Sequence, residues 1–334
     1  MEGKWNHKIF SVNEETFPGV ALEVFRFQYA NNPVYNKYVR ALGIVPGSVR
    51  SVYDIPFLPI HFFKSDPVCS TSFEPAAIFE SSGTTGSAVS RHRVRDLALY
   101  EESFKKAVSS VYGPLADCCV IGLLPSYLER QNSSLIFMVN KMIEESRCPE
   151  SGFYLDEYDR LKDCLTRLEA RGQKTLLIGV TFALLDFAAR CPLPLQHTTI
   201  IETGGMKGRR RELLREEVHA LLKAAFSVPA IHSEYGMTEL LSQAWSTGDG
   251  IFQCPPWMKV WVREEDDPLQ LQVPASNGDG HPQKGVINII DLANIWSCSF
   301  IATEDAGLVR EDGRFEVQGR VDNSDIRGCN LLLA

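Results

Sequence analysis

The sequence between residues 76 and 232 alternates short apolar runs with longer segments of helical periodicity, and this alternation restricts the fold more than any other feature. The apolar runs lie at 76–80, 118–124, 175–180, 198–202 and 227–232. The helix-like segments lie near 95–111, 132–146, 157–171, 182–190 and 209–226. Continuous apolar runs are typical of strands buried on both faces, and strands that alternate with helices imply βαβ crossovers. The sequence therefore predicts an α/β fold whose mostly parallel sheet is flanked by helices.

The two ends of the chain follow other patterns. Residues 14–42 predict two helices that are separated near Asn32-Pro33, and the proline-containing stretch 54–64 predicts an extended connection. After about residue 245 the helical periodicity fades, and short β-rich runs are joined by Gly, Pro, Asn and Asp turns. We expect a core over residues 1–245 and a smaller β-rich subdomain over 246–334.

Composition excludes several classes of function. The net charge is −8 and the pI is about 5.5, which argues against a general nucleic-acid binder because phosphate neutralisation requires a basic field. The N-terminal residues carry no apolar segment of signal-peptide length, and no run is long enough to span a bilayer. We expect a cytoplasmic protein without a transmembrane segment.

The nine cysteines indicate neither a disulfide framework nor a zinc site. Their number is odd, and no C-x-x-C pair is present. Most are expected to be small buried residues in a reducing compartment. Cys329, close to the end of the chain, is the candidate exception.

The first candidate site is the loop SSGTTGS at 81–87, which follows an apolar run. Glycines let consecutive amides turn inward, and four hydroxyls lie within five residues, so the loop is suited to hold phosphates. No Walker motif is present, because no G-K-[ST] follows. A polar turn after a buried strand is an equally good interpretation of the loop alone.

The second is HSEYGMTEL at 232–240. Tyr235 beside Gly236 suits stacking on a purine, Thr238 offers a hydroxyl to a phosphate, and Glu239 offers a carboxylate to Mg²⁺. The alternative is a helix N-terminus, in which Thr238 is the cap and Glu239 complements the helix dipole.

Two further signals lie in the C-terminal part. Asp305, in ATEDAGLV, is expected at a turn before a glycine, where a carboxylate can hold two ribose hydroxyls. Arg320, in GRVDNSDIRG, can neutralise phosphate charge. The alternatives are an ordinary turn aspartate and a surface salt bridge.

The order SSGTTGS, YGMTE, TEDAG and GRVDNSDIRG resembles the successive signatures of the adenylate-forming enzymes, which include acyl-CoA synthetases, adenylation domains and luciferases. The resemblance covers roughly residues 54–330. The DIPFLPIHFFK stretch, ESSGTTGS, ETGGMKGRRREL and the terminal IRGC are most similar to the acyl-protein synthetase (LuxE) family. This resemblance implies the large N-terminal domain of the adenylate-forming fold, with its small C-terminal domain absent.

The resemblance also implies a role for each matching residue. The residues implied to bind ATP are Ser81, Ser82, Gly83, Thr84, Thr85, Gly86, Tyr235, Gly236 and Asp305. Thr238 would contact the α-phosphate, Glu239 would hold Mg²⁺, and Arg320 would contact the ribose or phosphate. The implied reaction activates a long-chain fatty acid, or another carboxylic acid, with ATP to give an acyl-adenylate.

The sequence departs from the superfamily pattern in two places. The lysine that often follows the phosphate loop is replaced by SAVSR, so Arg91 is a candidate substitute. The chain also ends at Ala334, just after the hinge signature. Without the domain that shapes a CoA site, an internal thiol becomes an attractive acyl acceptor, and Cys329 matches the C-terminal cysteine of the acyl-protein synthetases. Arg327 would lower its pKa, and Cys298 is a reserve candidate.

Three hypotheses follow from these observations. The first is an acyl-protein synthetase that passes the acyl group from Cys329 to a partner reductase or carrier. The second is an acyl- or aryl-CoA ligase that lacks its C-terminal domain. The third is a non-catalytic nucleotide-binding subunit, which the intact set of Tyr235, Glu239, Asp305 and Arg320 disfavours.

Overall fold

The computed structural model describes residues 2–81, 89–124, 132–204, 213–265, 267, 269–272 and 282–321, with side chains from residue 5 onward. The chain forms two compact units, each assembled from segments that are distant in sequence. Unit 1 comprises Met1–Phe104, Gly236–Gln243 and the described part of Gln253–Asp325. Unit 2 comprises Lys105–Tyr235 and Ala244–Phe252. The boundary at residue 245 that we placed from sequence stays a prediction.

Unit 2 contains the parallel sheet that the alternating pattern predicts. Strands β5, β4, β6, β7 and β8 lie in this order and run parallel, and β9 joins β8 in antiparallel orientation. The strands are β4 (Cys119–Leu123), β5 (Gly152–Phe153), β6 (Thr175–Gly179), β7 (Thr198–Glu202), β8 (His232–Tyr235), β9 (Ala244–Ser246) and β10 (Ile251–Gln253). Every residue of β4 and β6 is buried, as expected for strands covered on both faces.

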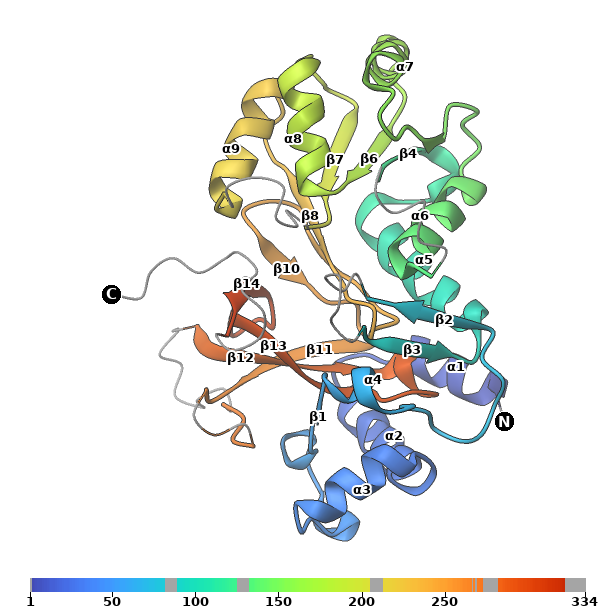
Figure 1. The fold of residues 1–334 in the computed structure, drawn as a ribbon, viewed down its shortest axis with the longest axis vertical. Helices are drawn as coiled ribbons and strands as arrows, with labels where there is room; N and C mark the ends of the chain where they lie inside the picture. The colour runs from blue at the N-terminus through green and yellow to red at the C-terminus, as the bar shows by residue number, and fades with distance from the viewer. Residues whose placement is uncertain are drawn as a thin grey trace. The chain divides into compact units, whose positions relative to one another are not determined.

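The helices of this region are α5 (Leu97–Tyr112), α6 (Ser134–Glu145), α7 (Tyr158–Ala170), α8 (Thr181–Arg190) and α9 (Arg215–Phe226). Val139 of α6 packs over Gly122 in β4, whereas Leu184 of α8 packs over Gly179 in β6. Gly122 pairs with Ile178, the neighbour of Gly179, so the two glycines face opposite sides of the sheet. Helices α6 and α8 therefore cover opposite faces (Figure 1).

Unit 1 is built on an antiparallel sheet. Strands β11, β12, β13 and β14 lie in this order, and β1 pairs in parallel with β13. The strands are β1 (Leu58–Pro59), β2 (Ala77–Glu80), β3 (Arg91–Val94), β11 (Met258–Arg263), β12 (Gln283–Asp291), β13 (Phe300–Val309) and β14 (Phe315–Arg320). The helical elements are α1 (Glu2–Phe10), α2 (Phe17–Asn31), α3 (Pro33–Ala41), η1 (Pro46–Ser48), η2 (Val52–Asp54), α4 (Phe62–Ser65) and η4 (Leu292–Asn294). The β-rich character expected after residue 245 is confirmed.

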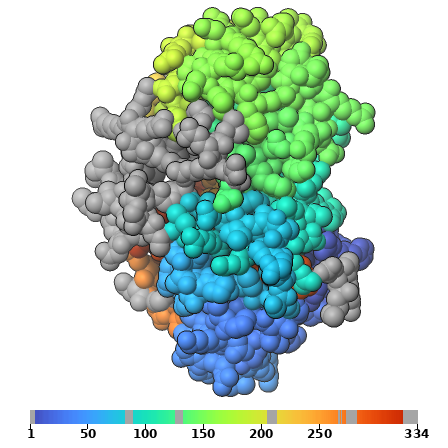
Figure 2. All heavy atoms as spheres, turned by 45° about the vertical axis from the view of Figure 1, so that its right-hand side comes forward, coloured from blue at the N-terminus to red at the C-terminus, as the bar shows by residue number. Residues whose placement is uncertain are grey.

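The N-terminal helices pack on this sheet through aromatic side chains. The Tyr35 ring stacks on Phe300 of β13, with ring centroids 5.9 Å apart, and the Phe25 ring meets both. Gln28 is buried, and its amide donates to the backbone oxygens of Asn294 and Ile295. The blue surface at the lower end of Figure 2 belongs to the N-terminal part of unit 1.

Three local predictions were wrong. The run 76–80 does not enter the parallel sheet, because β2 pairs with β3 in a separate antiparallel hairpin. The strand expected at 227–232 begins only at His232. Helix α9 extends to Phe226, and Ser227 ends it in the left-handed conformation. Asp305 does not lie at a turn but inside β13. None of the described helices is long and apolar enough to cross a membrane.

Candidate functional site

The glycine-rich loop connects β2 to β3, and its base is described. The Ser81 amide donates to the Ser90 carbonyl at 3.1 Å, and the Ser90 amide donates to the Ser81 hydroxyl at 2.9 Å. Below this pair, Arg91 donates to the Glu80 carboxylate at 3.1 Å. The predicted phosphate-binding residues Ser82, Gly83, Thr84, Thr85 and Gly86 lie outside the described residues. The role of Arg91 in place of the missing lysine stays a prediction.

Glu239 lies within unit 1 beside the base of this loop. Its side chain is 5% exposed and hydrogen-bonds the Ser90 side chain. Burial raises the pKa of Glu239, and the Ser90 contact and the positive charge of Arg320 partly offset that rise. A buried carboxylate with only partial compensation is suited to a cation.

The backbone around Glu239 is fixed by two polar side chains that sequence reasoning missed. Asn294 donates to the Glu239 carbonyl at 2.6 Å. The Nδ1–H of His92 donates to the Thr238 carbonyl at 2.9 Å. Burial lowers the pKa of His92 to about 4, so the ring stays neutral and acts through hydrogen bonds. The hydrogen bond from His92 therefore holds the backbone of Thr238, one of the predicted site residues, in place.

Asp291 anchors the other end of the same segment. Its carboxylate accepts from the amides of Leu241 and Ser242 at 2.8 and 3.0 Å and from the Ser242 hydroxyl at 2.6 Å. The carboxylate is fully buried, which raises its pKa to about 6 in spite of these donors. The only sequence signal for this role is an aspartate at the end of the apolar strand β12.

Asp305 and Arg320 form a pair across β13 and β14. They are directly opposite in the register, and the Arg320 Nε lies 3.4 Å from an Asp305 oxygen. A β-bulge next to the pair shifts the register between Ala306 and Gly307, and Gly319 accommodates it with φ of 139°. At Gly307 an added Cβ would lie 2.5 Å from the Glu316 carbonyl, so the strands approach too closely for any other residue.

Unit 1 therefore brings together the loop base, Glu239 and the Asp305–Arg320 pair. The charges of both Asp305 and Arg320 act on the Glu239 carboxyl. Gly236 and Thr238 belong to the same segment as Glu239. Cys329, the predicted nucleophile, lies outside the described residues.

Unit 2 holds Tyr235, at the end of β8. The ring is 9% exposed, and its centroid lies 5.8 Å from that of Phe252. Beside it, burial and the nearby charge of Glu202 raise the pKa of Glu234 to about 8. Glu202, at the end of β7, accepts from the Thr181 hydroxyl and from the Gly204 amide.

The reserve nucleophile Cys298 is not suited to that role. The side chain is completely buried and donates to the Phe300 carbonyl at 3.4 Å. Burial raises its pKa to about 12, so it remains a thiol at neutral pH. Within the described part of the chain, no group of three or more His, Cys, Asp or Glu side chains is arranged to hold a metal ion.

Comparison with known proteins decides the family. The family model of acyl-protein synthetases, LuxE, matches residues 10–334. The chain belongs to the acyl-protein synthetase (LuxE) family. A curated relative, a long-chain-fatty-acid–luciferin-component ligase from Vibrio harveyi, is 24% identical over 343 positions, which cover 93% of this chain and 85% of the relative.

Solved structures support the fold of this family. ATP-bound MatB from Rhodopseudomonas palustris superposes with a TM-score of 0.54 and 19% identity, and ATP-bound RpMatB-BxBclM chimera B1 with 0.55 and 19%. In both cases the alignment covers 75% of this chain and 49% of the other. The chain thus spans about half the length of these structures, and the adenylate-forming α/β fold expected from the motifs is confirmed.

Proposed function

We propose that the protein activates a long-chain fatty acid with ATP and then transfers the acyl group to its own Cys329. Membership of the acyl-protein synthetase family and the ligase name of the Vibrio relative support this reaction. The observation that carries the proposal is the buried Glu239, which contacts Ser90 at the base of the glycine-rich loop.

In the first step a fatty carboxylate oxygen attacks the α-phosphorus of ATP. The new bond is a mixed carboxylic–phosphoric anhydride, and pyrophosphate leaves with the electron pair of the broken P–O bond. The loop 81–87 is suited to hold the leaving phosphates through backbone amides and hydroxyls. Asp305 would accept hydrogen bonds from the ribose hydroxyls, and Arg320 would orient Asp305 and face the phosphate.

Glu239 is the residue proposed to hold Mg²⁺. A single buried carboxylate next to a phosphate-binding loop fits the preference of this ion for one or two carboxylates together with phosphate oxygens. When bound, Mg²⁺ neutralises charge on the phosphates as the pyrophosphate departs. Burial keeps water away from the carboxylate, and Asn294 holds its backbone in place.

In the second step the Cys329 thiolate attacks the acyl carbonyl carbon. A thioester forms, and AMP leaves as the anhydride C–O bond breaks. The acyl group then passes to an acyl reductase or carrier protein. This partner and a cytoplasmic location stay predictions.

Pyrophosphate release tests the first step. Wild-type protein with ATP, Mg²⁺ and fatty acids of graded length is expected to release pyrophosphate, and EDTA should abolish the release. Glu239→Gln keeps the size of the side chain and removes its charge, so we expect release to fall by about 100-fold or more. Glu311→Gln, on the exposed turn before β14, is the matched control. Absence of pyrophosphate release with every acid would refute the proposal.

Labelled fatty acid tests the second step. Wild-type protein should carry hydroxylamine-labile label, Cys329→Ser should lose the label and still release pyrophosphate, and Cys69→Ser should keep the label. Label on Cys329→Ser would exclude this thiol as acceptor. Label transferred only to added CoA would identify a CoA ligase instead.

A further inference from the structure

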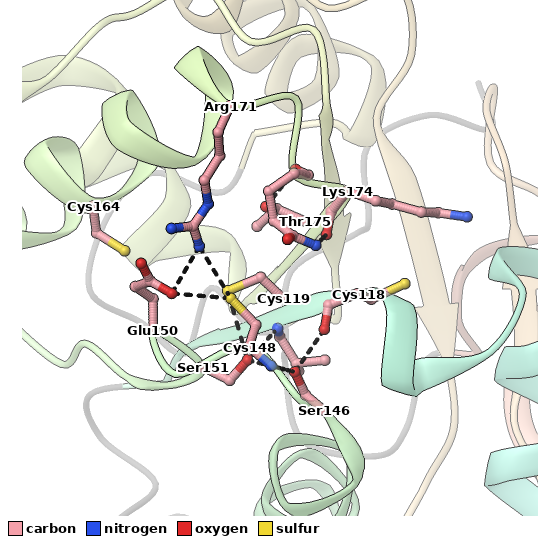
Figure 3. A network of polar contacts seen from close by, with 12 residues as sticks. Cys118, Cys119, Ser146, Cys148, Glu150, Ser151, Cys164, Arg171, Lys174 and Thr175 are labelled. Atoms are coloured by element: carbon pink, nitrogen blue, oxygen red, sulfur yellow. Dashed lines mark hydrogen bonds and ion pairs between the residues drawn. The ribbon is translucent and has the colours of Figure 1, made fainter.

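Unit 2 contains a group of thiols that the proposed reaction does not use. Cys119 is the first residue of β4, Cys148 lies in the turn before β5, and Cys164 lies on α7 (Figure 3). Three segments of the chain thus contribute cysteines to one polar network. We call these three residues the thiol cluster.

Within the thiol cluster, Cys119 and Cys148 are in direct contact. Their side chains interact with each other (Figure 3), and the Ser151 hydroxyl donates to the Cys119 sulfur at 3.6 Å. The Ser146 hydroxyl contacts the Ser151 hydroxyl at 2.7 Å and accepts from the Cys148 amide at 3.2 Å. The backbone that presents Cys148 to Cys119 is therefore held in place by two serines.

The two thiols differ in access and in electrostatic environment. Cys119 is completely buried, whereas Cys148 is half-buried. The Arg171 guanidinium lies 3.6 Å from the Cys148 sulfur, and its side chain is 46% exposed. The same guanidinium donates to the Glu150 carboxylate at 2.8 Å, so Cys148 lies beside an ion pair at the edge of the cluster. The thiolate is the form of a cysteine that reacts with oxidants. Glu150 accepts from the Cys148 thiol at 3.1 Å, and the Arg171 hydrogen bond lowers the pKa of Glu150 to about 2, so the thiol proton leaves to water or to the departing hydroxide rather than to this carboxylate.

The other cysteines nearby have different partners. The Cys164 sulfur accepts from the Tyr154 hydroxyl at 3.2 Å. Cys118 points away from the cluster, and its thiol donates to the Pro114 carbonyl at 3.6 Å. Cys119 and Cys148 are therefore the two thiols of the cluster that are placed to react with each other.

We propose that Cys148 and Cys119 form an oxidant-sensitive thiol pair that closes to a disulfide when a peroxide enters. The Cys148 thiolate attacks one peroxide oxygen, the O–O bond breaks, and hydroxide leaves, which gives a sulfenic acid. The Cys119 thiol then attacks the Cys148 sulfur and displaces the hydroxyl group, which leaves as water. In total, two thiols and one hydrogen peroxide give one disulfide and two waters, and an external dithiol reverses the change.

Peroxide treatment followed by alkylation and tryptic mass spectrometry tests the pair. We expect a peptide beginning at Cys148 to be linked to the peptide of residues 107–130, with the loss of two hydrogen atoms. Iodoacetamide labelling of Cys148 should fall by about tenfold and return after dithiothreitol. Because Cys118 and Cys119 share one tryptic peptide, Cys118→Ser is the matched control and should keep the link.

The Cys148→Ser variant should lose the link, and the Cys119→Ser variant should accumulate a dimedone-reactive sulfenic acid at Cys148. Because Cys119 is buried, far-UV circular dichroism is used to check that this variant folds, and the Cys148→Ser result stands independently of it. Unchanged labelling of Cys148, a link to Cys164, a link that disappears in Cys118→Ser, or oxidation of Cys148 only to sulfinic acid would overturn the proposal.

Discussion

Each unit holds a carboxyl group whose pKa is raised, and the two groups are compensated in different ways: Asp291 of unit 1 is fully buried, whereas Glu234 of unit 2 is half-buried. In unit 1, Asp291 accepts hydrogen bonds from three backbone amides and one hydroxyl. In unit 2, Glu234 faces the charge of a second carboxyl, Glu202. Burial raises both pKa values, from 3.8 to about 6 for Asp291 and from 4.5 to about 8 for Glu234.

The difference shows that burial depth alone does not decide the charge of a carboxyl group. Backbone amides favour the ionised form of Asp291, so the group is ionised at neutral pH and anchors the segment of Glu239. Glu234 has a like charge nearby and is largely protonated at pH 7. Unit 1 therefore uses a buried, charged anchor, whereas unit 2 holds a half-buried, neutral acid.

Removing the anchor is expected to have the largest effect on stability. Asp291→Ala leaves the buried amides of Leu241 and Ser242 without their acceptor, so we expect the free energy of unfolding to fall by about 3 kcal/mol. Urea denaturation measures this loss. Asp312→Ala, which removes an exposed carboxylate from unit 1, is the control. A loss no larger than that of the control would show that Asp291 is not an anchor.

Disturbing the pairing of β13 with β14 should reduce the free energy of unfolding nearly as much. Gly307→Ala places a methyl group against the Glu316 carbonyl and the Ile287 side chain, so we expect a loss of about 2 kcal/mol in the free energy of unfolding. Gly47→Ala, also in unit 1, is the control, because nothing lies within 4 Å of the added methyl and the φ of Gly47 is not positive. Equal losses in the two variants would argue against the close approach of β13 and β14.

The stability of the protein should depend on pH through the carboxyl group of Glu234 in unit 2. A raised folded-state pKa means that stability is greatest below the unfolded pKa and is lost as pH rises, between about 4.5 and 8 for Glu234 and between about 3.8 and 6 for Asp291. Glu234→Gln should therefore gain stability over wild type, by about 2 kcal/mol, as pH rises from about 6 to 8.

Unfolding measured at several pH values, with Asp291→Asn alongside, separates the two groups. The difference between Asp291→Asn and wild type should change little in that upper window, since Asp291 has already titrated. A Glu234→Gln difference that does not vary between pH 6 and 8 would contradict the assignment of a neutral acid.

Breaking the Asp305–Arg320 pair, which is proposed to face the nucleotide, should have the smallest effect on stability. Arg320 is 50% exposed, so Arg320→Ala should cost less than about 1 kcal/mol, as should Arg314→Ala on the same hairpin. Only Arg320→Ala should reduce pyrophosphate release. Loss of activity in both variants would point to the hairpin as a whole rather than to the Arg320 side chain.

Much of the fold and part of the site were predictable. The helices α2 and α3 and the strands β4, β6 and β7 fall where the sequence pattern places them, because buried strands and amphipathic helices leave local signatures. The hairpin β2–β3 was missed, since an apolar run of four residues does not reveal its partner strand. His92, Asp291 and Asn294 carry no motif and were missed for a related reason, because their roles depend on contacts with distant residues.

The sequence by itself determined the family, the order of the motifs and the succession of strands and helices, since these depend on local residue type and spacing. Only the tertiary structure decided which groups meet. The bulge beside Gly307 places Arg320 opposite Asp305, the packing of unit 1 brings Ser90 to Glu239, and the turn before β5 brings Cys148 to Cys119. Such contacts join residues far apart in the chain, so they depend on strand pairing and packing rather than on any local pattern.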